Sequence, residues 1–382
     1  MKKEKFGVLI LALILLLIFS KVYSKNINTN DIENNYDFKK VINIFEEYIN
    51  DSEIEEFEPK MILESIINSN GKVNNINVKN IIDVFFEQIK TISKECISLF
   101  VIIVIGALLS SIQLDEDSDV VRITKIVIYI SLSILLVKKY VDNIVIFKDL
   151  VNKLTIIIQT VSTFLIGVVV ATGKISSATS VDSIILCISN IICSAVEFIV
   201  IPCFSFSLVI NIISKISENI KLTEFSKLFR KSTIYVFLVI IGAFFSVLKL
   251  ETTITSSVDN LTYKVAQDAI ANSVPVVGGF LSDSLDTVLH STKIIGKVGG
   301  VFSIVCTGII VLIPIAKLLG IIIVYSVLMA ICEPLTSDNN IKELIGEFKA
   351  IHTEMLGIII GIMVVLVISI TIIINIIGNV GG

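Results

Sequence analysis

The chain has 382 residues, of which 54% are hydrophobic and 17% charged, and its formal net charge is −4. Soluble globular proteins carry about 25% charged residues, so this composition argues against a soluble enzyme and favours a chain whose apolar residues face lipid. The sequence has two histidines and six cysteines, but it lacks the closely spaced ligands of a zinc site and a basic patch for nucleic acid. We therefore expect no metal, no cofactor, no nucleic-acid partner and no enzymatic activity.

The first residues have the layout of a secretory signal peptide. Lysines in the first five residues precede an apolar core at 6–19, and Val22 and Ser24 supply the aliphatic and small residues of a cleavage site. Because the core is short for a membrane span, we expect cleavage after Ser24, with an uncleaved anchor as the alternative. Either arrangement places residues from Lys25 onward outside the cytoplasm.

Residues 25–96 form the one soluble-looking region. Apolar residues recur at spacings of three and four over 57–67 and 81–92, which is typical of amphipathic helices. Their apolar faces need a partner, which is each other, the membrane surface or another protein. We expect a small exported helical region.

Residues 97–382 are expected to form a multi-span membrane domain. Uncharged runs in this region are long enough to cross the ~30 Å hydrocarbon core as helices. Two longer runs contain a proline and an ionisable residue, so each is either one kinked helix or two half-helices. The fold class is therefore an all-α polytopic membrane protein with about six spans, within a range of five to eight. The spans are expected near 97–114, 154–172, 183–214, 232–248, 298–332 and 356–378.

The uncharged run 126–137 lies between Lys125 and Lys138 and is short for a span. We expect it to be re-entrant or interfacial. Lysine and arginine then concentrate in the loops assigned to the cytoplasm, as the positive-inside rule requires. If 126–137 crossed the membrane while every other run crossed once, these positive loops would move outside.

Two ionisable residues lie inside the interrupted runs. Glu197 is near Pro202, and Lys317 is near Pro314. Ionisable groups within a span are costly and are treated as functional until another role is found. Glu197 and Lys317 either pair with each other or lie near a membrane interface, where Lys317 would extend toward water.

Weaker motifs also occur in the apolar segments. Gly357 and Gly361 form a GxxxG, a cue for close helix packing. The stretch 167–174 resembles a phosphate-binding loop only superficially, because the spacing of its glycines is wrong and Ile175 replaces the required Ser or Thr. Three amides are expected to hydrogen-bond between helices: Gln159, Asn190 and Asn211.

Residues 251–300 are expected to be an extracytoplasmic loop with short helices. The stretch 273–280 is a break marked by Pro and Gly, and 281–289 has apolar residues on one helical face. The loop either lies on the outer membrane face or forms a re-entrant hairpin that lines a pore. Its candidate functional residues are Pro275, Gly278, Gly279, Asp283, Asp286, Gly296 and Gly299.

The motif in 273–300, Pro-Val-Val-Gly-Gly followed by Ser-Asp, Asp-Thr-Val-Leu and Gly-Lys-Val-Gly, resembles the stage III sporulation protein AE family of endospore-forming bacteria. The order of signal peptide, short exported region and several spans extends the resemblance over nearly the whole chain. The resemblance implies a subunit of the channel, or feeding tube, between mother cell and forespore, required for development of the engulfed forespore. It would act as an export or permease-like component or as a platform.

The resemblance also implies a location and partners. The location is the mother cell membrane around the forespore, with residues 25–96 in the space between the two membranes. The partners are the other stage III sporulation membrane proteins with their cytoplasmic ATPase, a forespore channel partner, the lipid bilayer and possible further copies of this chain. No catalytic residues carry over from the family.

The expected mechanism places the helix breaks at Pro202 and Pro314, with loop residues 273–300, at the core of a conduit or docking platform. Glu197 and Lys317 would stabilise or gate that core. One alternative is a secondary transporter acting alone, with Glu197 as its coupling group. The other is a non-conducting membrane scaffold.

Overall fold

A computed structural model describes residues 36–51, 58–68, 78–112, 119–216, 222–273, 278–335 and 339–378. Within these ranges the chain is helical, with one π-helical segment and no strand. The expected signal peptide, with its cleavage after Ser24, and the loop residue Pro275 lie outside the described residues.

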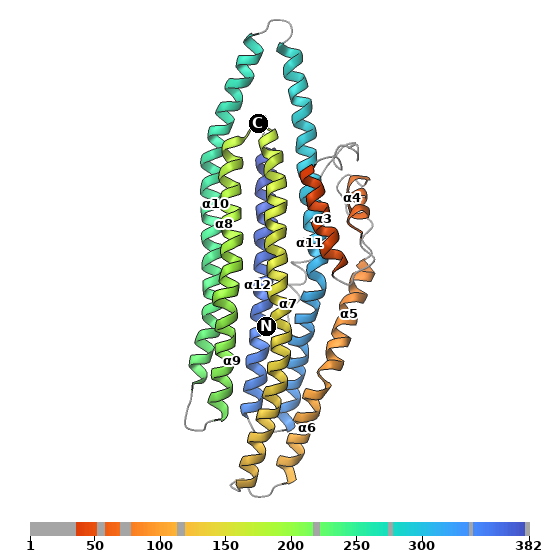
Figure 1. The fold of residues 1–382 in the computed structure, drawn as a ribbon, viewed down its shortest axis with the longest axis vertical. Helices are drawn as coiled ribbons and strands as arrows, with labels where there is room; N and C mark the ends of the chain where they lie inside the picture. Colours follow the sequence, from red (N-terminus) through yellow and green to blue (C-terminus); the bar gives the residue numbers. More distant parts are fainter. Residues whose placement is uncertain are drawn as a thin grey trace.

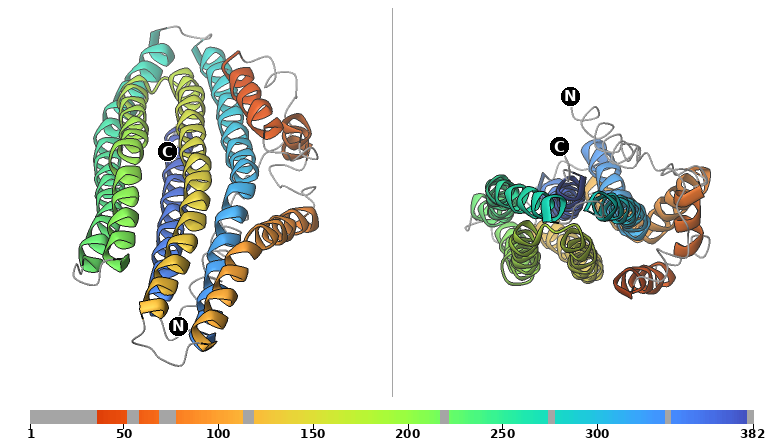
Figure 2. Two further views of the ribbon diagram at one scale, coloured as in Figure 1. Left: turned by 60° about the horizontal axis from the view of Figure 1, so that its bottom comes forward. Right: turned by 90° about the horizontal axis from the view of Figure 1, so that it is seen from above.

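The helices form one long bundle whose members run up and down side by side (Figure 1). They are α3 (Tyr36–Asn50), α4 (Pro59–Asn68), α5 (Val78–Glu95), α6 (Ile97–Ile112), α7 (Asp119–Ala171), α8 (Ile175–Ala195), the π-helical η1 (Val196–Val200), α9 (Ile201–Ile216), α10 (Thr223–Ser273), α11 (Gly278–Leu335) and α12 (Asn339–Gly378). Helix α12 occupies the centre and packs against α11, α7, α10 and α9, as the view from above in Figure 2 shows. Helices α3 to α5 lie on the outer side of α11.

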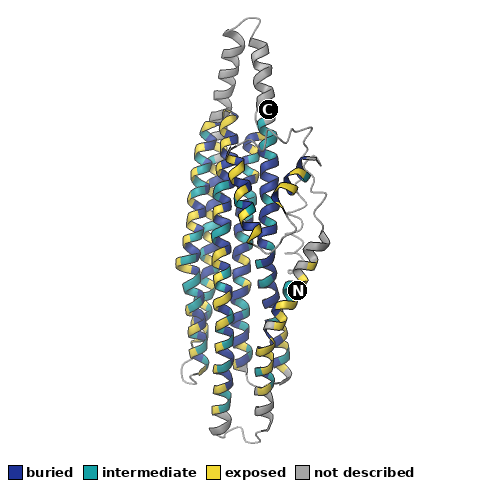
Figure 3. Ribbon diagram, turned by 45° about the vertical axis from the view of Figure 1, so that its right-hand side comes forward, coloured by how far each residue is buried: buried dark blue, intermediate teal, exposed yellow. Residues whose placement is uncertain are grey.

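The central position of α12 follows from its composition. Its apolar residues are buried on several sides, among them Ile358, Ile359 and Ile362, none of which has any exposed surface. A helix that is hydrophobic around its circumference is stable only when it is surrounded by apolar partners. In α9 and α10, by contrast, large apolar side chains such as Phe206 and Val239 are exposed on the outer face, and Figure 3 shows exposed residues along the outside of the bundle. Lipid is the natural environment for such a surface.

Among the residues that the structure describes, five helical segments are long and apolar enough to cross a membrane. They are Ile123–Ala171, Ile175–Ile216, Thr223–Glu251, Thr292–Glu333 and Asn340–Gly378. The prediction of an all-α polytopic membrane protein is confirmed, and five lies within the expected range. The run expected to span near 97–114 is helix α6, whose described part, Ile97–Ile112, has 16 residues and is not among the five.

The expectation of short helices in 251–300 is wrong. Helix α10 continues to Ser273, and α11 begins at Gly278 and continues through the next apolar run. The two helices extend beyond α7, α8 and α12 at one end of the bundle (Figure 1). Polar residues in this stretch do not interrupt the helices, because a helix satisfies its own backbone hydrogen bonds wherever no proline intervenes.

Residues 126–137 are likewise not a separate element, because they belong to the 53-residue helix α7. The ends joining α6 to α7, α9 to α10 and α11 to α12 lie at the same end of the bundle, opposite the turn between α7 and α8 (Figure 1). The sequence assigns these three connections to a common side, and the up-and-down path of the helices is compatible with that assignment. Which side faces the cytoplasm stays a prediction.

The interrupted run 183–214 is one continuous rod rather than two half-helices. It consists of α8, η1 and α9 in direct succession. Pro202 has no backbone N–H to donate, and the π-helical segment lies immediately before it. There the N–H of Ile201 reaches back to the carbonyl of Val196, which is the wider π-helical spacing. The second run is also continuous, since Pro314 lies within α11.

Candidate functional site: a buried ion network between α9, α10 and α12

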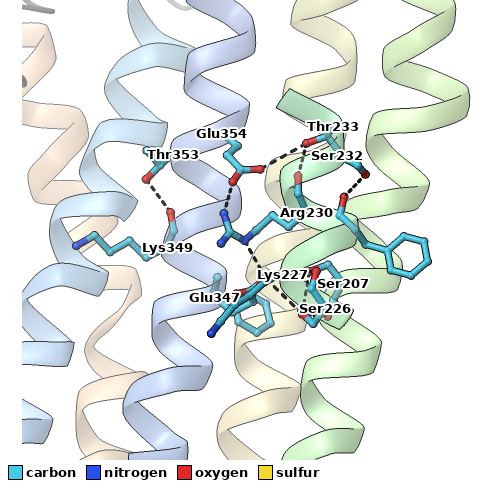
Figure 4. Close-up of polar contacts among 12 residues, drawn as sticks. Ser207, Ser226, Lys227, Arg230, Ser232, Thr233, Glu347, Lys349, Thr353 and Glu354 are labelled. Carbon is cyan, nitrogen blue, oxygen red and sulfur yellow. Dashed lines mark hydrogen bonds and ion pairs between the residues drawn. The ribbon is translucent and has the colours of Figure 1, made fainter. Parts of the chain in front are cut away.

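The most unusual polar cluster in the described part of the bundle is centred on Arg230 of α10. Its Nε lies 2.9 Å from Oε1 of Glu347, and its Nη1 is paired with Glu354. Both glutamates belong to α12 and are seven residues apart, so they lie on one face of the helix, two turns from each other. Figure 4 shows the guanidinium between the two carboxylates.

Hydroxyl groups of α9 and α10 complete this network. The hydroxyl of Ser207 donates to Oε1 of Glu347 over 2.8 Å, and that of Ser226 donates to the carbonyl of Ser207 over 2.8 Å. On the other side, Oγ1 of Thr233 lies 3.4 Å from Oε2 of Glu354. The network therefore joins the hairpin of α9 and α10 to the first half of α12.

The charged side chains of the network are largely withdrawn from solvent, with 14% of Arg230, 6% of Glu347 and 13% of Glu354 exposed. The nearby pair of Lys227 and Glu224 is different, because Glu224 is 88% exposed. Removing one partner of a buried ion pair typically costs about 3–5 kcal/mol, since the remaining charge stays desolvated. An exposed pair is worth about 1 kcal/mol or less.

Sequence patterns single out none of these three charged residues. Arg230 and the two glutamates lie just outside the uncharged runs, where a charge is expected to belong to a loop. A signal is present, however. Glu347 and Glu354 repeat at seven residues immediately before a long apolar run, a spacing that puts two acids on one face of a helix entering the bundle.

Of the two alternatives for Glu197 and Lys317, the pair between them does not form. Glu197 instead pairs with Lys148 of α7 over 2.6 Å, and both side chains are nearly half exposed, at 42% and 46%. Lys317 is half-buried on α11, and the structure shows no ion pair for it within the described residues. Glu197 therefore lies at the bundle surface and not in a shared core with Lys317.

The loop motif contributes close helix packing rather than a loop. Gly278, Gly279, Asp283 and Asp286 lie in the first turns of α11. Further along this helix, a Cβ at Gly296 would come within 2.7 Å of Ile377 of α12 and 3.0 Å of Val168 of α7.

Gly299 and Gly300 follow the same pattern. A Cβ at Gly299 would come within 2.4 Å of Phe164, and one at Gly300 within 2.6 Å of Ile374. Gly296 and Gly300 thus form a GxxxG that lets α11 approach α12. In the GxxxG singled out from the sequence, only Gly361 has a close neighbour, Phe237, while Gly357 faces open space.

Two of the three amides, Gln159 and Asn190, form the expected interhelical hydrogen bonds. Nε2 of Gln159 in α7 donates to Asn190 over 3.0 Å and to Ser189 over 3.1 Å, both in α8. Asn211 differs, because its Oδ1 is buried without a hydrogen-bond partner among the described residues.

Lys174, the last residue of the superficial phosphate-loop match, has a structural partner. It follows Gly173, whose φ of 83° lies in the left-handed region, at the turn between α7 and α8. Its Nζ donates to the carbonyl of Ile376 over 2.7 Å, and only 2% of the residue is exposed. A cation at the C-terminal end of a helix is favourable, because the last carbonyls lack intrahelical donors. Lys174 thus fastens the end of α12 to this turn.

The apolar face of α3, the first helix of the exported region, packs against the bundle itself. Phe38 and Phe45 of α3 are buried and pack edge-on against Phe302 of α11, and Phe38 also makes a tilted contact with Phe164 of α7. The sequence left three partners open, and none of them is the main contact of α3. Its apolar face is instead buried against α7 and α11 of the membrane domain.

Charged groups reinforce the contact between α3 and α7. Nζ of Lys153 lies 5.4 Å above the ring of Tyr48, 3.5 Å from Asp51 and 3.3 Å from Asp149. Burial raises the pKa of Tyr48 above its ordinary value near 10, and the carboxylates of Glu47, Asp149 and Asp51 add to the effect. Tyr48 therefore stays neutral throughout the physiological range.

Among the described residues, no three His, Cys, Asp or Glu side chains are grouped as metal ligands would be.

The fold and its buried ion network define a polytopic all-α membrane protein with a charged cluster inside its helix bundle. The family model for stage III sporulation protein AE matches residues 57–376, and the chain belongs to this family. A curated relative, stage III sporulation protein AE of Bacillus subtilis (strain 168), is 24% identical over 220 residues. The match covers 58% of this chain and 55% of the relative, so it spans about half of that protein's length. No solved structure matches.

Proposed function

We propose that this chain is a membrane component of the channel between mother cell and forespore, and that it works there as an export or permease-like subunit. Membership of the stage III sporulation protein AE family supports the sporulation role. The observation that favours a permease-like subunit over a passive scaffold is the buried network of Arg230, Glu347 and Glu354. Ionisable groups inside a membrane protein are expensive and commonly mark a transport path or a moving element.

The proposed moving element is the hairpin of α9 and α10. The hairpin of α9 and α10 is tied to α12 by Arg230, Glu347 and the serine pair, and the π-helical segment η1 lies just above it in α8–α9. Segments of this kind occur frequently at functional sites, because their backbone is less regularly bonded. In the proposal the hairpin pivots at η1 and Pro202 while the ion network opens and closes.

The proposed location is the mother cell membrane around the engulfed forespore, with residues 25–96 facing the space between the two membranes. The proposed partners are the other stage III sporulation membrane proteins, their cytoplasmic ATPase, a forespore channel protein and further copies of this chain. Helix α3 would reach these partners only through its exposed face, since Phe38 and Phe45 are buried against α7 and α11.

The test is replacement of the native gene in a spore-forming host by this chain and its variants. We expect Arg230→Gln to abolish expression of a forespore reporter after engulfment while the protein remains in the membrane and still co-purifies with its partners. The matched control is Lys342→Gln, which removes a pair with the exposed Glu333 and should behave as the unmodified chain.

Other outcomes separate the alternatives. If Arg230→Gln leaves reporter expression intact while loss of the chain abolishes it, the scaffold explanation replaces the permease-like one. If forespore development does not require the chain at all, the sporulation role itself is refuted. Accumulation of a substrate by vesicles that contain this chain alone would instead indicate a transporter that acts without partners.

A further inference from the structure

The ion network contains one more negative charge than positive charge. Arg230 faces two carboxylates, Glu347 and Glu354. The other cations on the packed elements are already engaged, because Lys227 is bound to Glu224 and Lys215 of α9 to Glu343.

The charge of Lys227 also acts on Glu347, but its ammonium group is hydrogen-bonded to Glu224 over 2.6 Å. Lys349 of α12 points away from the network in Figure 4, and Lys231 of α10 is exposed. From α7, Tyr140 approaches α12 through an edge-to-face contact with Phe348, and its hydroxyl is hydrogen-bonded to Ser205. A buried carboxylate without a compensating charge is costly and is relieved when the group takes up a proton.

The hydroxyl of Thr233 indicates where the proton lies. A hydroxyl has one hydrogen to donate, and Thr233 donates it to the carbonyl of Arg230 over 2.7 Å. Oε2 of Glu354 is a second acceptor within reach of this hydroxyl, 3.4 Å away, and it goes without that hydrogen when the nearer carbonyl takes it. In that case the contact is favourable only if Oε2 carries a hydrogen. Arg230 donates to both carboxylates, and Glu347 receives the hydroxyl of Ser207 in addition.

We propose that Glu354 binds an exchangeable proton in this bundle, with its O–H directed at Thr233, while Glu347 keeps its pair with Arg230. When the proton leaves to water, the carboxylic acid becomes a carboxylate and one guanidinium faces two negative charges. The repulsion between the carboxylates weakens the contact between α10 and α12. The use of this proton as a gate rests on the proposed conduit function, whereas its presence on Glu354 does not.

The experiment is infrared spectroscopy of the full chain in phospholipid bilayers near neutral pH, in H2O and D2O. We expect a carbonyl band of a protonated carboxyl that shifts in D2O, loses the intensity of one carboxyl in Glu354→Gln and is unchanged in Glu343→Gln. Asp182 also has a buried oxygen without a partner among the described residues, so Asp182→Asn identifies any contribution from that acid. The intensity lost in Glu354→Gln must persist in Asp182→Asn.

A second variant keeps the test decisive if Glu354→Gln fails to fold. Thr233→Val removes the acceptor, so the band should move to higher frequency without losing intensity. Absence of a protonated-carboxyl band from the unmodified chain, or a band that neither Glu354→Gln nor Thr233→Val alters, would overturn the proposal. Because the measurement involves no sporulation, its failure is distinct from failure of the channel assay.

Discussion

Gly299 provides a quantitative test of how the loop motif functions, because alanine there would overlap its neighbours. A Cβ would lie 2.4 Å from Cε1 of Phe164 and 3.3 Å from Cε2 of Phe38, whereas carbon atoms normally approach to about 3.5–4.0 Å. Both rings are held in place, since Phe164 is 2% exposed and Phe38 is fully buried. Overpacking of this kind typically costs about 1–3 kcal/mol, which opposes a gain of about 1 kcal/mol from replacing glycine by alanine inside a helix.

The matched control is Gly357→Ala, because a Cβ at that position would have no neighbouring atom within 4 Å and the variant receives only the helical gain. The two variants should therefore differ in free energy of unfolding by about 1–3 kcal/mol, or roughly 5- to 150-fold in the equilibrium constant. Reversible unfolding in mixed micelles measures this difference by circular dichroism. Val41 is fully buried in α3, so a cysteine placed there should react with a maleimide faster if α3 also loosens. Equal unfolding and equal labelling of the two variants would refute the packing role of Gly299.

Three further substitutions test separate contacts. Phe38→Ala should destabilise the docking of α3 by about 3–5 kcal/mol, the usual cost of removing a buried Phe, and proteolysis of α3 should accelerate; an unchanged rate would contradict its aromatic anchoring. Lys174→Met leaves the carbonyl of Ile376 without its buried donor and should cost about 1–3 kcal/mol of unfolding free energy. Glu197→Gln breaks only the half-exposed pair with Lys148 and should cost about 1 kcal/mol or less, so loss of forespore development in this variant would restore Glu197 as a functional group.

The sequence was sufficient for the fold class, because uncharged runs of this length have few alternatives to membrane helices. It was insufficient for the lengths of the helices, because a charged residue does not by itself end a helix. Helix α7 continues through Lys148 and Lys153, whose ammonium groups pair with Glu197, Asp149 and Asp51. A charged residue ends a span only where it must leave lipid for water, and a partner on a neighbouring helix removes that need.

The ion network was beyond sequence reasoning for a different reason. Arg230 and Glu347 are separated by 117 positions, and nothing local to either residue indicates the other. For Gly296 and Gly299 the sequence shows the motif but not its structural role. Their motif is recognisable, but glycine is equally suited to a flexible loop and to a close helix contact, and only the position of Phe164 and Ile377 decides between them.

The two kinds of glutamate in this chain show why position within an apolar run is a poor guide to function. Glu197 lies in the middle of such a run, yet its carboxylate reaches the bundle surface and meets a half-exposed lysine that balances its charge. Glu354 lies at the edge of a run, yet its carboxylate is buried beside an arginine already engaged by Glu347. What sets the role of each acid is therefore the balance of donors and charges around it, because Glu197 has a lysine of its own whereas Glu354 shares Arg230 with Glu347.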